Sequence, residues 1–247
     1  GNTGWSIVDG VIASSDNTYA TATLTILGAT TNYLKATNFG FSIPAGSTIN
    51  GIVVEWERKD VAGGGPDSKD NAVRIVKGGT IGSTDKSNGS TWPSADAYAS
   101  YGSSTDLWGE TWTVSDINAS TFGAALSATS ISGSAGSPSV DHVRITVHYT
   151  SGINISGTVY TDEGTTTMAS GRTISVSVNG AAAAGNTTTG SDGTYTISSI
   201  AVSAGDVLTL YLDGATEKGV TVTVGTGSNL TGINIFQNDL ITRQDNS

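Results

Sequence analysis

A chain of 247 residues is long enough for two β-domains of ordinary size, each with a hydrophobic core of its own. Only 13% of the residues are charged and the formal net charge is −10, with no basic stripe, which excludes a nucleic-acid-binding protein. The chain has no cysteine and no apolar run near the roughly 18–20 residues of a membrane span, so disulfides, thiolate metal sites and membrane-spanning helices are excluded.

Residues 1–150 are dominated by the period-two alternation of antiparallel strands. Ile52, Val54 and Trp56 alternate with Val53, Glu55 and Glu57, which predicts a half-buried strand. Further strands are expected at residues 19–24, 32–41, 73–75, 122–128 and 143–149. One short helical turn is expected at Pro93–Tyr98, because proline favours the first position of a helix. We expect an antiparallel sandwich of jelly-roll type.

A domain boundary is expected at Thr150-Ser151-Gly152, because all five tryptophans precede it and the strands that follow are shorter. These strands are expected at residues 153–160, 173–178, 194–197, 207–212, 219–224 and 230–236. A set of about seven short strands is typical of an immunoglobulin-like sandwich. The expected fold is therefore all-β, with a jelly-roll-like domain at 1–150 and an immunoglobulin/transthyretin-like domain at 151–247 that ends in a strand extension.

Two motifs carry a family resemblance. The run Ile155–Tyr160 (ISGTVY), followed by Gly190–Ile197 (GSDGTYTI), resembles the carboxypeptidase regulatory-like domain of bacterial surface proteins. That family is a non-catalytic, transthyretin-type sandwich, so the resemblance implies a stalk or spacer. Phe39–Ile49 (FGFSIPAGSTI) resembles the entry to a strand in jelly-roll modules of carbohydrate-binding and virion proteins.

The sequence offers no catalytic residues, and we expect the protein not to be an enzyme. His142 and His148 are the two histidines, and six residues of strand would separate them by roughly 20 Å, too far to share one metal or substrate. Glu55 and Glu57 lie within the separation that glycosidases use, but a solvated sheet face explains them as well. No nucleophile elbow, Walker loop or zinc-protease motif is present.

Asp60, Asp67 and Asp70 flank a glycine-rich loop, and oxygen ligands on a loop suit a calcium ion. The spacing lacks the order of an EF-hand, so a solvated acidic loop is the competing interpretation. We expect no cofactor.

Five aromatic residues crowd into a glycine-rich segment: Trp92, Tyr98, Tyr101, Trp108 and Trp112. Exposed rings of this kind stack against sugars, which makes the cluster a candidate glycan-binding site. Rings that fold inward over the end of the sandwich are the alternative.

Both terminal segments contain strand-like apolar residues, which are Trp5, Ile7, Ile233, Ile235, Leu240 and Ile241. Either segment could add a strand to a neighbouring copy of the chain. Ordinary pairing within the domain is the alternative.

These observations favour an extracellular structural or adhesive module, either a cell-surface filament subunit or the stalk of a large surface protein. Its expected partners are copies of itself or neighbouring domains, with glycans as further candidates. A carbohydrate-binding module and a phage tail-fibre or capsid-decoration protein are the alternative functions.

Overall fold

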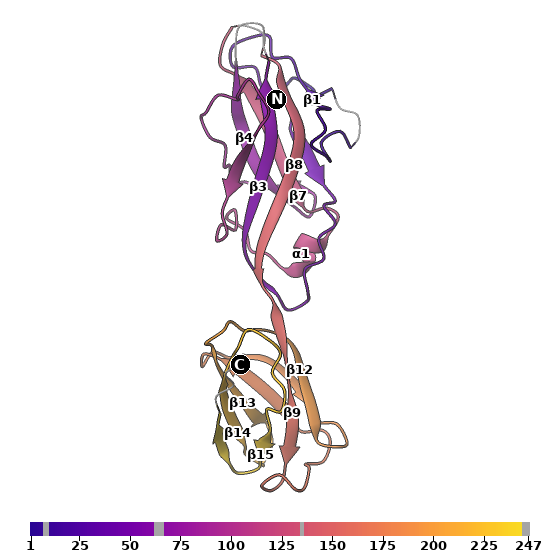
Figure 1. Ribbon diagram of the computed structural model, residues 1–247, viewed down its shortest axis with the longest axis vertical. Coiled ribbons are helices and arrows are strands. Elements are labelled where there is room, and N and C mark those ends of the chain that lie inside the picture. Colours follow the sequence, from indigo (N-terminus) through magenta and orange to yellow (C-terminus); the bar gives the residue numbers. More distant parts are fainter. Residues whose placement is uncertain (7–9, 62–66, 134–135, 244–247) are drawn as a thin grey trace. The chain divides into compact units, whose positions relative to one another are not determined.

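A computed structural model describes residues 1–6, 10–61, 67–133 and 136–243 (Figure 1). The chain is all-β apart from one five-residue helix among these residues, as the alternation predicts. It divides into two compact units, one made of Gly1–Ser42 and Ile49–His148 and the other of Ile43–Thr48 and Tyr149–Ser247.

Two four-stranded sheets build the first unit. One sheet has the strand order β1 (Ala20–Thr21), β8 (Pro138–Thr150), β3 (Thr48–Asp60), β6 (Ala97–Gly102). The other has the order β2 (Leu34–Thr37), β7 (Gly123–Ser130), β4 (Ser68–Lys77), β5 (Thr80–Ile81). The registers described in this unit are antiparallel.

The core of the first unit follows the predicted alternation. Ile52, Val54 and Trp56 on β3 are fully buried, and so are Val73 and Ile75 on β4. Because successive side chains of a strand point to opposite faces, each strand supplies one apolar row to the space between the sheets.

Strand β8 follows this rule only in part. Val143 is buried, but Ile145 and Val147 are half-buried and Tyr149 is 41% exposed. The neighbouring strand β1 pairs only with Ser139 and Val140, so it does not accompany the rest of β8. The later part of the apolar row on β8 is therefore left incompletely covered.

The helical turn predicted at Pro93–Tyr98 is wrong, since this segment enters strand β6. The helix of the described residues is α1 (Val114–Asn118). Thr113 caps it: its hydroxyl accepts a hydrogen bond from the Asp116 amide, and the Asp116 carboxylate accepts one from the Thr113 amide. This reciprocal capping box satisfies donors that the first helical turn would otherwise leave unpaired.

The second unit contains a five-stranded and a three-stranded sheet. The larger sheet has the order β11 (Ala183–Thr188), β10 (Thr173–Val178), β13 (Val207–Asp213), β14 (Val220–Val224), β16 (Leu240–Thr242). The smaller has the order β12 (Thr194–Ala201), β9 (Gly152–Tyr160), β15 (Ile235–Phe236). Pairing is antiparallel except for β16 beside β14 and β15 beside β9, which are parallel.

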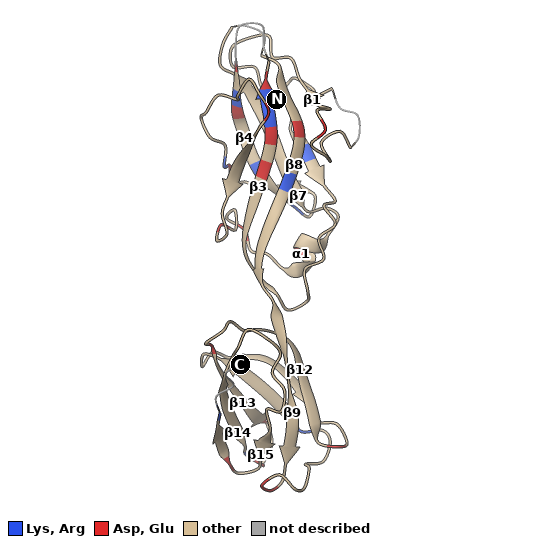
Figure 2. Cartoon of the chain, viewed as in Figure 1, with Lys and Arg blue, Asp and Glu red and all other residues tan. Residues whose placement is uncertain are grey.

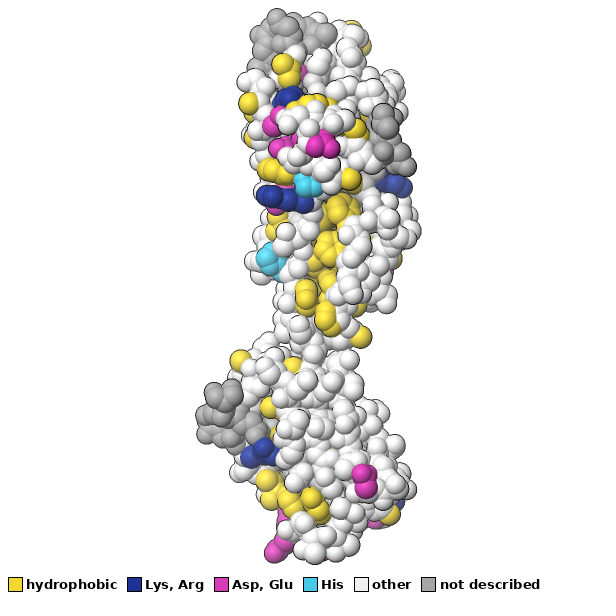
Figure 3. All heavy atoms as spheres, turned by 45° about the vertical axis from the view of Figure 1, so that its right-hand side comes forward, with side chains coloured by type: hydrophobic (Ala, Val, Ile, Leu, Met, Phe, Trp, Pro, Cys, Tyr) yellow, Lys and Arg dark blue, Asp and Glu magenta, His cyan; other side chains and the backbone are white. Residues whose placement is uncertain are grey.

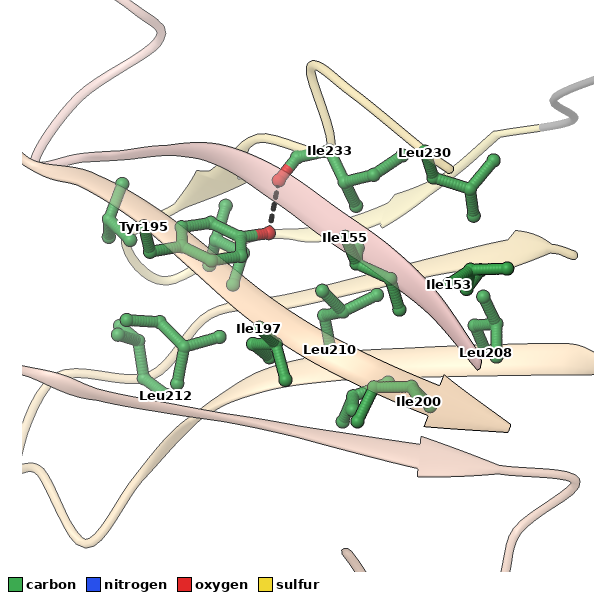
Figure 4. Close-up of a cluster of buried hydrophobic side chains, with 14 of the residues drawn as sticks. Ile153, Ile155, Tyr195, Ile197, Ile200, Leu208, Leu210, Leu212, Leu230 and Ile233 are labelled. Carbon is green, nitrogen blue, oxygen red and sulfur yellow. Dashed lines mark hydrogen bonds between the residues drawn. The ribbon is translucent and has the colours of Figure 1, made fainter. Parts of the chain in front are cut away.

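An aliphatic cluster fills the second unit (Figure 4). Ile155, Ile197 and Ile233 lie within it, and the buried Tyr195 hydroxyl donates a hydrogen bond to the Ile233 carbonyl. Gly157 permits this packing, because a Cβ at that position would lie 2.0 Å from the same carbonyl oxygen. The residues that carry the family resemblance thus hold the segment before β15 against the core.

Candidate functional site

Three of the five aromatic residues proposed to bind glycans are core residues. Trp92 and Trp108 are fully buried and Tyr101 is 4% exposed. The Trp92 indole N–H donates to the Asp70 carboxylate at 2.8 Å, and that of Trp108 donates to the Ile52 carbonyl at 2.9 Å. These three rings fold inward and present no face to a sugar, which corrects the glycan-site expectation for them.

The other two rings, Tyr98 and Trp112, are half-buried and contact different partners. The Tyr98 hydroxyl is 2.7 Å from His142 Nδ1, and the Arg144 guanidinium lies 4.1 Å from the Tyr98 ring centroid. Trp112 packs edge-on against Phe122, with 5.3 Å between ring centroids. The five aromatic residues therefore form no common stacking platform.

The three aspartates proposed to bind calcium are not assembled into a site. Asp70 is buried against Arg58, with 3.3 Å between Oδ1 and Nη1, and accepts a hydrogen bond from the Tyr101 hydroxyl at 2.7 Å. Asp60 is also buried, and its carboxylate accepts hydrogen bonds from the amides of Asp67 and Ser137. No group of three metal-binding side chains occurs in the described part of the chain, and the loop 62–66 lies outside it.

Glu55 belongs to an ion pair on the outer face of β3. Arg144 of β8 donates two hydrogen bonds to its carboxylate, at 2.7 and 3.0 Å. These bonds, together with one from the Ser100 hydroxyl, hold the pKa of Glu55 below its ordinary value. Figure 2 shows acidic and basic positions close together on β3 and β8. The geometry is that of a charge-paired sheet face.

The C-terminal residues proposed as assembly strands fall into two groups. Ile233 and Ile235 are fully buried in the core of the second unit, so they are unavailable for another copy. Leu240 is 67% exposed and Ile241 half-buried, both on the edge strand β16.

The N-terminal candidates for an assembly strand are Trp5 and Ile7. Trp5 is half-buried, and its indole N–H donates to the Asn32 carbonyl at 2.9 Å. Ile7 lies outside the described residues.

A groove of about 700 Å³ runs along the first unit, between β2 and β8. Its apolar lining includes Leu34, Phe39, Phe41, Val143 and Ile145, and Gly10–Ala13 line it as well. Figure 3 shows a continuous stripe of hydrophobic side chains along this unit. We call this feature the β2–β8 groove.

Among the described residues, two sheet edges at the groove lack a strand partner. Strand β2 ends its sheet with β7 as its strand neighbour, and β1 accompanies only the beginning of β8. Sequence reasoning missed the groove, since the alternation along 143–149 predicts an inward row without indicating how far the opposite sheet extends.

Among the described residues, no helix is long and apolar enough to cross a membrane. Comparison with known proteins gives no matching family model and no matching curated protein. Two solved structures are similar over 96% of this chain. The first is domains D2 and D3 of the major pilin SpaD from Corynebacterium diphtheriae, at 12% identity, a TM-score of 0.28 and 99% of that chain. The second is the full-length pilin, at 13% identity, a TM-score of 0.28 and 65% of that chain. TM-scores of this size do not establish a shared fold.

Proposed function

We propose that this chain is a structural module of an extracellular assembly that associates with other β-structured chains through the β2–β8 groove. The observation that carries the proposal is a groove, lined in part by apolar side chains, beside two sheet edges that lack a strand partner in the described part of the chain. Uncovered edges offer unpaired backbone donors and acceptors, and apolar side chains between them gain stability when a further strand covers them.

The arrangement of charges supports a structural rather than a catalytic role. Ion pairs join Glu55 to Arg144, Asp70 to Arg58 and Asp106 to Lys86. In the last pair, Asp106 Oδ2 lies 2.6 Å from Lys86 Nζ. The hydrogen bonds of Glu55 and Asp106 to their basic partners help to hold the pKa values of these two carboxyl groups below their ordinary values, so both are poor general acids near neutral pH. The paired charges therefore hold strands and loops in place.

We further propose that the second unit is a spacer of the transthyretin type. The Ser-Gly-Thr-Val and Asp-Gly-x-Tyr motifs support this proposal because each has a packing role here. Gly157 allows the close approach of the Ile233 carbonyl, and Gly193 has a φ of 77° in the turn before β12. Such roles build a rigid module and involve no ligand.

Electron microscopy and sedimentation velocity of the purified chain test the proposal. We expect ordered assemblies, or a mass that rises with concentration, because the groove takes part in association between chains. A monomer at every concentration, with no particle larger than one chain in the micrographs, would contradict it.

A further inference from the structure

We infer that the segment Gly10–Tyr19, which we call the 10–19 strap, is an inhibitory cover on the edge of strand β8. In its place on β8, the strap occupies a backbone position that an added strand would need. Its release would free this edge and strengthen association between copies of the chain. The inference rests on the proposed function and adds a regulatory device to it.

The 10–19 strap takes the place of a strand beside β8. Strand β1 pairs with Ser139 and Val140 of β8, and the strap that precedes β1 leaves this ladder. It returns to β8 at Ile12, whose carbonyl accepts a hydrogen bond from the Val143 amide at 3.2 Å. Residues two apart in a strand direct their backbone groups to the same side, so Ile145 presents its amide along the same edge. The strap therefore caps the start of an edge that β8 continues to Thr150.

One anchor of the 10–19 strap is the carboxylate of Asp141 on β8. Asp141 is 1% exposed and accepts hydrogen bonds from the amides of Asp16 and Asn17, at 3.4 and 3.1 Å. A local turn presents these amides: the Asp16 carboxylate accepts hydrogen bonds from the Thr18 amide at 2.9 Å and from the Ser14 hydroxyl at 2.8 Å. The shape of the turn thus decides whether the strap reaches Asp141.

A second anchor lies at the end of the strap. The Tyr19 hydroxyl donates a hydrogen bond to the Asp96 carboxylate at 2.8 Å. The same carboxylate lies 3.1 Å from Lys59 Nζ, which in turn is 3.8 Å from the centroid of the Tyr19 ring. Polar contacts with residues of or next to β8, β3 and β6 therefore hold the strap in place.

The 10–19 strap contributes no side chain to the core. Val11, Ile12 and Tyr19 are half-buried, and the other residues of the strap are exposed. A segment held by exposed hydrogen bonds, without buried apolar contacts, opens locally at a lower free energy than core strands do. Ala20, at the start of β1, is fully buried, so opening would end there and the first unit would keep its fold.

Opening of the 10–19 strap would change the β2–β8 groove as well as the edge. The first four residues of the strap, Gly10–Ala13, line the groove together with Val143 and Ile145. Their departure would leave the β8 edge open at the point where its apolar side chains are half-covered. Pairing at a strand edge uses main-chain hydrogen bonds, which any strand can supply, and in a solution of the purified chain the available strands belong to other copies.

Two variants of the full chain release the strap without touching the core. The first combines Asp16→Ala with Tyr19→Phe, which removes the acceptor of the local turn and the hydroxyl that binds Asp96. The second replaces residues 14–18 with glycine throughout, which keeps the length of the strap and removes its turn. Circular dichroism and melting temperature establish that both variants are folded.

Hydrogen exchange and sedimentation velocity measure the two consequences of release. In both variants the Val143 amide should exchange about tenfold faster than in the wild type, because it loses the Ile12 carbonyl, while the Trp56 amide on β3 should be unchanged. Both variants should also associate about tenfold more strongly than the wild type.

The matched control combines Asp192→Ala with Tyr211→Phe in the second unit. Asp192 is exposed, and its carboxylate accepts hydrogen bonds from the amide and hydroxyl of Thr194, a turn of the same kind as that of Asp16. Tyr211 is half-buried, as Tyr19 is. This variant loses the same charge and the same hydroxyl far from the strap in sequence, and it should match the wild type in both measurements.

The outcomes separate the inference from the proposed function. If Val143 exchanges faster while association stays at the wild-type level or weakens, the strap does not inhibit, and the inference fails while the proposed function stands. If the glycine variant changes neither the exchange nor the association, the strap does not cover the edge, and the inference fails in the same way. If the wild type and all variants stay monomeric at every concentration, the proposed function fails together with the inference.

Discussion

Trp108, a candidate for glycan binding with a core position as the alternative, is a structural anchor. It has a φ of 58°, a left-handed conformation that bulky residues rarely adopt. Its buried ring and its hydrogen bond to the Ile52 carbonyl offset the cost of that backbone conformation.

Trp108→Ala should therefore lower the free energy of unfolding by about 3–5 kcal/mol, the usual cost of truncating a large buried ring. Urea denaturation, monitored by tryptophan fluorescence, measures this change in the free energy of unfolding. Tyr33→Ala is the control, because Tyr33 is 40% exposed and its truncation should change stability by about 0.5 kcal/mol or less. Unchanged stability of Trp108→Ala, with loss of binding to a glycan, would contradict the core assignment.

Asp70 and Arg58 form a buried ion pair that links β4 to β3, strands of different sheets. Asp70→Asn should lower the free energy of unfolding by about 3–5 kcal/mol, because it leaves the Arg58 charge buried without its carboxylate partner. The double variant with Arg58→Met should be more stable than Asp70→Asn alone. Chemical denaturation of the single and double variants measures both effects, and equal stabilities would show that the pair has no such role.

The calcium interpretation has a test of its own. Since Asp60 and Asp70 are committed to protein donors and to Arg58, added calcium or a chelator should leave the melting temperature unchanged. A rise in melting temperature with calcium would show a site that the described residues do not form.

Asp162 should make the stability of the fold depend on pH. Its carboxylate accepts hydrogen bonds from the amides of Thr166, Thr165 and Gly164, which lower its pKa from 3.8 to about 2. A carboxyl group whose pKa is lower in the folded state stabilises the fold above pH 4 and loses this effect as the pH falls towards 2. The melting temperature of the wild type should thus exceed that of Asp162→Asn at pH 5, and the difference should vanish near pH 2. A constant difference across this range would refute the assignment.

At the scale of elements, β15 and β16 follow each other closely in sequence and differ in what they do. Ile235 of β15 is fully buried, whereas Leu240 of β16 is largely exposed. The C-terminal extension is therefore part core strand and part surface strand.

Ile235→Ala should lower the free energy of unfolding by about 2–5 kcal/mol, and Leu240→Ala by about 0.5 kcal/mol or less. Denaturation of the two variants, side by side, provides the comparison. Similar costs for both would contradict the division of roles between β15 and β16.

Sequence patterns identified the elements with strong alternation and missed those without it. Strand β10 lies where the Val/Thr alternation predicts, at Thr173–Val178. Strand β11 escaped prediction because an edge strand with exposed faces needs no apolar row. Helix α1 escaped because its capping box is a local signal without a periodic apolar face.

At the scale of the whole molecule, the two units have separate cores. The cluster around Ile155 and Leu210 consists of residues of the second unit, whereas Trp56, Trp92 and Trp108 belong to the first. Separate cores favour separate cooperative transitions.

Scanning calorimetry should therefore resolve two unfolding transitions. Trp108→Ala should lower the midpoint temperature of the transition of the first unit, and Ile235→Ala that of the second unit. A single transition that both substitutions lower equally would show that the two units unfold together.

The sequence by itself determined the all-β class and the inward rows of β3, β4 and β9, because these properties depend on the two-residue period of a single strand. Only the tertiary structure decided which aromatic rings are buried, how Asp70 is paired and where β8 is left uncovered. Those properties depend on residues distant in sequence, such as the two-residue length of β1 beside a thirteen-residue β8. No local pattern records where a neighbouring strand stops, and the groove exists because β1 stops early.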